Sequence, residues 1–181
     1  MIRKFACALG AVLLAVSFTY AQTPAAPKKA TPKVAPPSKA QTAPAKAVNA
    51  PLPPQKRFPT PQAVVDEHLA AINACDFNRL MAQYPDDVQF FLPGGQVVKG
   101  RQEVAELFRG FVKPVKDGGL CGLKFTTEHT FAVGDTINVM WVGNADFLAE
   151  PYRGADAYET KNGLMQAQVT TFDGAALKMK K

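Results

Sequence analysis

A sharp change in composition near residue 60 limits the part of this chain that can fold into a packed domain. Residues 22–60 contain 10 of the chain's 15 prolines, seven basic residues and no acidic residue, and alanine fills most of the rest. A segment with so few large apolar side chains cannot bury enough surface to offset its conformational entropy. We therefore predict that residues 22–60 form a disordered linker, partly polyproline II, and that residues 61–181 form one folded domain.

The first 21 residues have the three parts of a secretory signal. A basic start at Arg3 and Lys4 is followed by an apolar run over residues 5–18, and small side chains stand at Thr19 and Ala21. This pattern predicts cleavage after Ala21 and a protein that is exported, either to the periplasm or out of the cell. The apolar run is shorter than the ~20 residues that a bilayer-spanning helix needs, so we expect no permanent membrane anchor.

Charge is distributed unevenly between the linker and the domain. The whole chain carries a formal net charge of +6, but residues 61–181 contain 12 basic and 15 acidic residues. A domain with that balance lacks the basic surface typical of nucleic-acid binding, so we expect no nucleic-acid partner. The basic linker serves either as a passive tether or in weak contacts with an anionic surface of the cell envelope.

Cleavage of the signal would leave two cysteines, Cys75 and Cys121, in a compartment where disulfides form. They either pair in a disulfide or stay as two buried thiols. Neither has a histidine at ligand spacing, so the sequence predicts no metal site. A phosphate-binding glycine loop and a serine nucleophile motif are also missing from the sequence, and we expect no cofactor.

Capping residues mark the helices at the start of the domain. Thr60 followed by Pro61 predicts a helix start, and the apolar positions after it recur at helical spacing around a single histidine, His68. Asp76 predicts the start of a second, short helix, and a third follows Gly100. The domain therefore begins with helices.

Strand signals dominate the remainder of the domain. Gly94 and Gly95 lie between two short apolar segments and predict a hairpin turn. From residue 123 onward apolar residues alternate, which predicts long strands; we expect residues 149–162 to be irregular and residues 164–172 to form the final strand. This order predicts an α+β fold in which helices cover one face of a curved sheet.

Four short motifs stand in a fixed order along the domain. They are Ala71-Ile72-Asn73-Ala74-Cys75-Asp76, Tyr84-Pro85-Asp86-Asp87-Val88, Leu92-Pro93-Gly94-Gly95 with Lys99-Gly100-Arg101-Gln102-Glu103-Val104, and Phe172-Asp173-Gly174. Together they resemble the nuclear transport factor 2-like superfamily, in particular its SnoaL-like and ketosteroid-isomerase-like branch, over residues 62–177. The family usually has glycine at the position of Cys75. The cysteine at this position is unusual, which is consistent with the disulfide alternative.

The resemblance implies a cone-shaped fold, with N-terminal helices packed on a strongly curved antiparallel sheet and a cavity between them. Members of the family use that cavity in different ways. Some are isomerases, cyclases or hydrolases of hydrophobic substrates, and others bind ligands or partners without chemistry, so the fold does not define the activity. Related folds often pair through the open face of the sheet, which makes a homodimer an expectation here.

The resemblance also places three residues in a ketosteroid-isomerase-like site. Leu92 stands where those enzymes carry the carboxylate that removes a proton, His68 at the place of an oxygen-stabilising tyrosine, and Gln168 at the place of a protonated aspartic acid. Leucine cannot transfer a proton, whereas histidine and glutamine can donate hydrogen bonds. The resemblance thus implies that the oxygen-binding half of such a site is present and that its base is missing.

Two further residues are candidates for the pocket. Gln166 shares one side of the final strand with Gln168, and Trp141 either lines the cavity or packs in the core. His68 has a similar alternative as an ordinary core histidine. The acidic residues that could supply a replacement base from the late part of the chain are Asp146, Asp156 and Glu159.

These features lead to two main functional hypotheses. The first is an exported, non-enzymatic domain that binds a small apolar ligand or a partner, with a pocket lined by His68, Gln168, Gln166 and Trp141. The alternative is a ketosteroid-isomerase-like or cyclase-like enzyme acting on a hydrophobic carbonyl substrate. A structural role at the cell envelope, led by the basic linker, is a third. A carboxylate in the pocket would discriminate between the first two.

Overall fold

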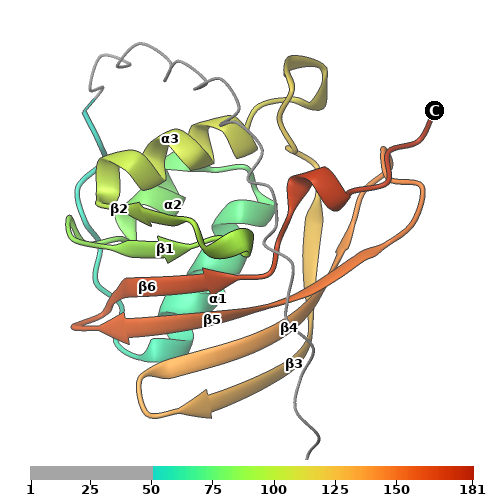
Figure 1. Ribbon diagram of the computed structural model, residues 1–181. Coiled ribbons are helices and arrows are strands. Elements are labelled where there is room, and N and C mark those ends of the chain that lie inside the picture. Colours follow the sequence, from blue (N-terminus) through green and yellow to red (C-terminus); the bar gives the residue numbers. More distant parts are fainter. Residues whose placement is uncertain (1–50) are drawn as a thin grey trace, which may run out of the picture. The chain divides into compact units, whose positions relative to one another are not determined.

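The computed structural model describes residues 51–181, which form three α-helices and a six-stranded sheet (Figure 1). The expected signal peptide and the expected linker as far as residue 50 lie outside the described residues. Within the described part of the chain, no helix is long and apolar enough to cross a membrane.

The three helices begin where the sequence predicts. Helix α1 (Pro61–Asn73) starts after Thr60, whose hydroxyl accepts a hydrogen bond from the Ala63 N–H at 3.1 Å. Helix α2 (Phe77–Ala82) is capped in the same way by Asp76, and α3 (Arg101–Phe111) follows Gly100. The buried residues of α1 are Val64, Val65, His68, Ala71 and Ile72. Helix α1 therefore packs this face against the sheet, where it contacts strands β3 to β6.

The sheet is strongly curved, and its strand order is β2-β1-β6-β5-β4-β3 (Figure 1). Its strands are β1 (Gln89–Phe91), β2 (Val97–Lys99), β3 (Lys124–Val133), β4 (Thr136–Asn144), β5 (Tyr152–Lys161) and β6 (Leu164–Thr170). The predicted α+β cone with helices on one face of a curved sheet is confirmed. One pairing differs from the all-antiparallel expectation: β6 runs parallel to β1, with Phe90 opposite Gln168. The sheet is mixed because the last strand inserts between β5 and the early hairpin.

The prediction that residues 149–162 are irregular is wrong, because most of them form strand β5. Small and polar residues hide the alternation of this strand, and Gly154 in particular lacks a side chain for a structural reason. It lies opposite Trp141 on β4, and a Cβ atom at Gly154 would come 2.4 Å from Cζ2 of the indole. The strand therefore makes room for a large buried ring instead of presenting an apolar side chain of its own.

The residues just before α1 also differ from the expectation of a disordered linker up to residue 60. The Lys56 and Phe58 N–H groups donate to the carbonyls of Ala82 and Gly163, and the buried Arg101 guanidinium donates to the Pro53 carbonyl. Leu52 and Phe58 pack against the hydrophobic core. The few apolar side chains of this proline-rich segment are enough to attach it, so the packed domain extends back at least to Leu52.

Two connections fasten the end of α1 to the start of β3. Cys75 and Cys121 are joined by a disulfide. The Asn73 side chain accepts a hydrogen bond from the Phe125 N–H at 2.7 Å and donates one to the Phe125 carbonyl at 2.9 Å, as a neighbouring strand would. The disulfide and the hydrogen bonds therefore both hold the segment between α3 and β3 against the end of α1.

Candidate functional site

The helices and the inner face of the sheet enclose a cavity of about 590 Å³. Most of its wall is apolar, with aromatic rings from α3 (Phe108 and Phe111), β3 (Phe125) and β4 (Trp141). Leu92, at the end of the first hairpin strand, also lines it. A cavity of this size and lining accommodates a small organic molecule.

One partly buried carboxyl group interrupts the apolar wall, while the other lining carboxyl group, that of Asp173, is exposed. Asp156 on β5 is partly buried and lines the cavity. The Thr170 hydroxyl donates to Asp156 Oδ1 at 2.6 Å, and the Tyr158 hydroxyl donates to Oδ2 at 2.8 Å. The Gln168 amide Nε2 approaches the same Oδ2 at 3.5 Å. Donors from two adjacent strands thus converge on both oxygens and orient the carboxyl group.

Burial raises the pKa of Asp156 above its ordinary value, because loss of water penalises the charged form more than the Thr170 and Tyr158 hydrogen bonds favour it. A raised folded-state pKa means that this group lowers stability as the pH rises through that pKa. A carboxyl group that costs stability and faces a cavity is a candidate for function rather than for folding.

A chain of polar contacts runs from Asp156 to helix α1. Gln168 joins Asp156 to Tyr84, whose hydroxyl donates to Gln168 Oε1 at 2.9 Å. The Tyr84 oxygen lies 3.4 Å from Nδ1 of His68. His68, Tyr84 and Gln168 are all buried. Burial raises the pKa of Tyr84 well above its ordinary value, so its hydroxyl stays protonated and keeps its place in this chain of contacts.

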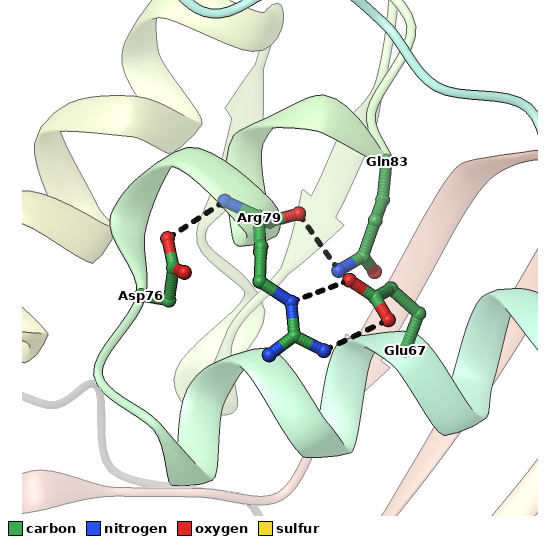
Figure 2. Close-up of polar contacts among 4 residues, drawn as sticks. All are labelled: Glu67, Asp76, Arg79 and Gln83. Atoms are coloured by element: carbon green, nitrogen blue, oxygen red, sulfur yellow. Dashed lines mark hydrogen bonds and ion pairs between the residues drawn. The ribbon is translucent and has the colours of Figure 1, made fainter.

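His68 is a neutral imidazole at physiological pH. Burial lowers its pKa to about 4, and the neighbouring Gln83 amide opposes only part of that shift. Gln83 is itself held by α2, since its Nε2 donates to the Arg79 carbonyl at 3.0 Å. Figure 2 shows how Arg79 in turn grips Glu67 of α1 with two nitrogen atoms, at 2.7 and 2.9 Å. The two helices thus fix the surroundings of His68.

The structure brings three of the four pocket candidates to the cavity. His68, Gln168 and Trp141 line it. Trp141 is also 1% exposed, so cavity and core are not exclusive alternatives for this residue. Gln166 was wrongly placed: its amide Nε2 donates to Asp87 Oδ1 at 3.1 Å in an exposed pair, and it does not line the cavity. A register shift in the β5–β6 pairing near this end of β6 breaks the simple alternation that grouped it with Gln168.

Of the acidic residues considered as replacements for a base at Leu92, only Asp156 lines the cavity. Glu159 is exposed on β5, and Asp146 lies in a separate surface depression beside Lys180. Sequence reasoning missed the residues that surround Asp156, namely Tyr158, Thr170 and Tyr84. Their position around Asp156 depends on the register of β5 against β6, which places Asp156 opposite Thr170. The spacing of these residues in the sequence does not reveal that register.

Among the described residues, no group of three or more histidine, cysteine or acidic side chains is placed to hold a metal ion. The two cysteines form the disulfide instead. Leu120, next to Cys121, lines the cavity, so the disulfide fastens one part of the cavity wall to the end of α1.

The fold is that of the nuclear transport factor 2-like class, and solved structures support this. A protein of unknown function from Cytophaga hutchinsonii, described as NTF2-like, is 16% identical with a TM-score of 0.52, covering 67% of this chain and 96% of its own. A putative ketosteroid isomerase from Kribbella flavida is 17% identical with a TM-score of 0.52, covering 62% of this chain and 77% of its own. A putative SnoaL-like polyketide cyclase from Shewanella putrefaciens is 14% identical with a TM-score of 0.52, covering 64% of this chain and 81% of its own.

Within that class, the model of the SnoaL-like domain family matches residues 65–168, more than half of the chain. The chain therefore belongs to the SnoaL-like domain family, as its sequence motifs indicate. Comparison with curated proteins finds no match. The similarity to solved structures is low in sequence identity and supports the fold alone.

Proposed function

We propose that this protein is an exported SnoaL-like domain that binds a small, mostly apolar ligand in its cavity without transforming it. The ligand's polar end meets Asp156, and the rest lies against the aromatic wall. The observation that carries this proposal is the cavity of about 590 Å³ in which one oriented carboxyl group faces a largely apolar surface. Such a combination of apolar lining and one placed polar group is typical of ligand sites.

Two residues, Leu92 and Asp156, support the proposal that the ligand is bound without being transformed. Leu92 occupies the place of the expected base, and leucine cannot accept a proton. Asp156 has both oxygens already engaged by hydroxyl donors, which suits recognition better than proton abstraction. His68, being neutral and in contact with Tyr84, is proposed as a support for this chain of contacts.

A second candidate function is that of a ketosteroid-isomerase-like or cyclase-like enzyme. The raised pKa of Asp156 favours it, because a carboxyl group with a raised pKa inside a cavity is suited to proton transfer. The two proposals differ in one assay, the isomerisation of a β,γ-unsaturated ketone. Turnover by the natural protein that is lost in Asp156→Asn would establish the enzyme, and we expect no such turnover.

The binding proposal is tested by narrowing the cavity. Calorimetric titration with 2-naphthol, an aromatic probe with one hydroxyl donor, is expected to show one saturable site on the natural protein. Leu92→Trp places a large ring in the cavity and should weaken this binding at least about tenfold, because the probe and the indole compete for the same volume. Val97→Trp is the matched control, since Val97 lies on the same hairpin, is 37% exposed and does not line the cavity.

Two outcomes of that titration would overturn the binding proposal. One is the absence of heat from the natural protein at probe concentrations in the millimolar range. The other is equal binding by Leu92→Trp and Val97→Trp, which would place the probe outside the cavity.

Export and self-association belong to the same proposal. Export rests on the signal in the first 21 residues. Pairing of two copies through the open sheet face remains a prediction; it is supported by apolar side chains on that face, with Phe131 68%, Met140 53% and Val169 50% exposed.

A further inference from the structure

We infer that the ligand of this cavity is an organic cation, an amine or quaternary ammonium group on a small apolar skeleton. This inference rests on the proposed binding function and adds the chemical class of the ligand. It follows from a carboxyl group without a positive partner and from the rings that surround it.

Asp156 has no cationic partner in the described part of the chain. The ion pairs of residues 51–181 involve other carboxylates, and none of the cavity-lining residues is lysine or arginine. His68, the one lining residue that could become cationic, is kept neutral by burial. A partly buried carboxylate without a counter-charge is unfavourable, so a positive ligand beside it would offset that cost.

The contacts of Asp156 are those of an acceptor. Thr170 and Tyr158 donate to its two oxygens, and Gln168 turns its amide nitrogen, not its oxygen, toward it because Tyr84 occupies the amide oxygen. The indole N–H of Trp141 is buried and makes no hydrogen bond to Asp156 or to any other described residue. Donors arranged in this way stabilise a carboxylate, the form that attracts a cation.

The cavity wall next to Asp156 provides aromatic faces. Trp141, Phe125 and Phe172 pack against one another, with ring centroids 5.0 to 6.2 Å apart, and all three rings line the cavity. The cation–π contacts of the described residues use Phe58 and Phe77, neither of which lines the cavity. The partly exposed rings of Phe125 and Phe172 are therefore available to an ammonium group.

The test compares two isosteric probes that differ in charge: choline and 3,3-dimethylbutan-1-ol, in which carbon replaces the quaternary nitrogen. Trp141 is the only tryptophan of the chain and lines the cavity, so its fluorescence reports occupancy of this site. We expect choline to bind the natural protein roughly tenfold more tightly than the neutral alcohol. Asp156→Asn keeps the shape of the side chain and should reduce that ratio to about one.

Glu159→Gln is the matched control, because Glu159 lies on the same strand as Asp156 but is exposed and does not line the cavity. The charge of Glu159 lies outside the cavity, so the choline preference should persist in Glu159→Gln. A ratio of one or less in the natural protein overturns the inference even if Asp156→Asn does not fold. An equal loss in Glu159→Gln and Asp156→Asn also overturns it. If 2-naphthol binds while choline shows no preference, the ligand is neutral and the binding function stands.

Discussion

Replacing both Cys75 and Cys121 by serine is expected to lower the free energy of unfolding by about 4 kcal/mol. The disulfide joins residues 46 positions apart and so removes a large amount of conformational freedom from the unfolded chain. It also closes the segment between α3 and β3 onto the end of α1, beside the Asn73 contacts with Phe125. Urea unfolding of the natural and doubly substituted proteins at one pH would measure the difference.

Reduction of the natural protein provides the matched control. Treatment with a thiol reductant breaks the same bond without changing the sequence and should shift the urea midpoint in the same direction. If both the doubly substituted and the reduced protein lose less than about 1 kcal/mol, the bond does not constrain the unfolded chain as described.

Gly154→Ala is expected to lower the free energy of unfolding by about 3 kcal/mol, a large effect for one methyl group. The added Cβ would lie 2.4 and 2.5 Å from two carbon atoms of the Trp141 indole and 2.7 Å from the Thr171 hydroxyl oxygen. The indole is buried among other rings and cannot swing away, so β4 and β5 would have to separate. Thermal unfolding of the natural protein and of Gly154→Ala, followed by circular dichroism, would measure this loss of stability.

Gly110→Ala is the control for that substitution. Gly110 lies in α3, and a Cβ atom there meets nothing within 4 Å. Alanine should stabilise the helix by up to about 1 kcal/mol. A cost at Gly110 equal to that at Gly154 would show that the packing against Trp141 does not decide the effect.

The sequence predicted the elements whose signals are local. Thr60 and Asp76 mark helix starts because a cap depends on residues within one turn, and Gly94 and Gly95 mark the hairpin because a turn depends on its own residues. Strand β5 was missed because its pattern reflects a neighbour: Gly154 is small to admit Trp141. The parallel pairing of β1 with β6 depends on contacts between segments far apart in the chain.

The candidate site was predictable only in part for the same reason. Helical spacing placed His68 on the buried face of α1, and family resemblance placed Gln168 beside the cavity. Asp156 stood among three acidic candidates until the strand register showed which one lies opposite Thr170. Tyr84, in the loop after α2, joins the site through a hydrogen bond across 84 sequence positions, which no local pattern indicates.

The central claim, that the cavity is a ligand site, is tested most directly at the Trp141 indole N–H. The chain has one tryptophan, so an ¹⁵N-labelled sample should give one indole signal in the amide proton spectrum, and it comes from a buried group in the cavity wall. Titration with 2-naphthol is expected to move this signal in a saturable, one-to-one manner. An unmoved indole signal, while amides on the exposed face of β3 and β4 shift, would place binding outside the cavity and contradict the account.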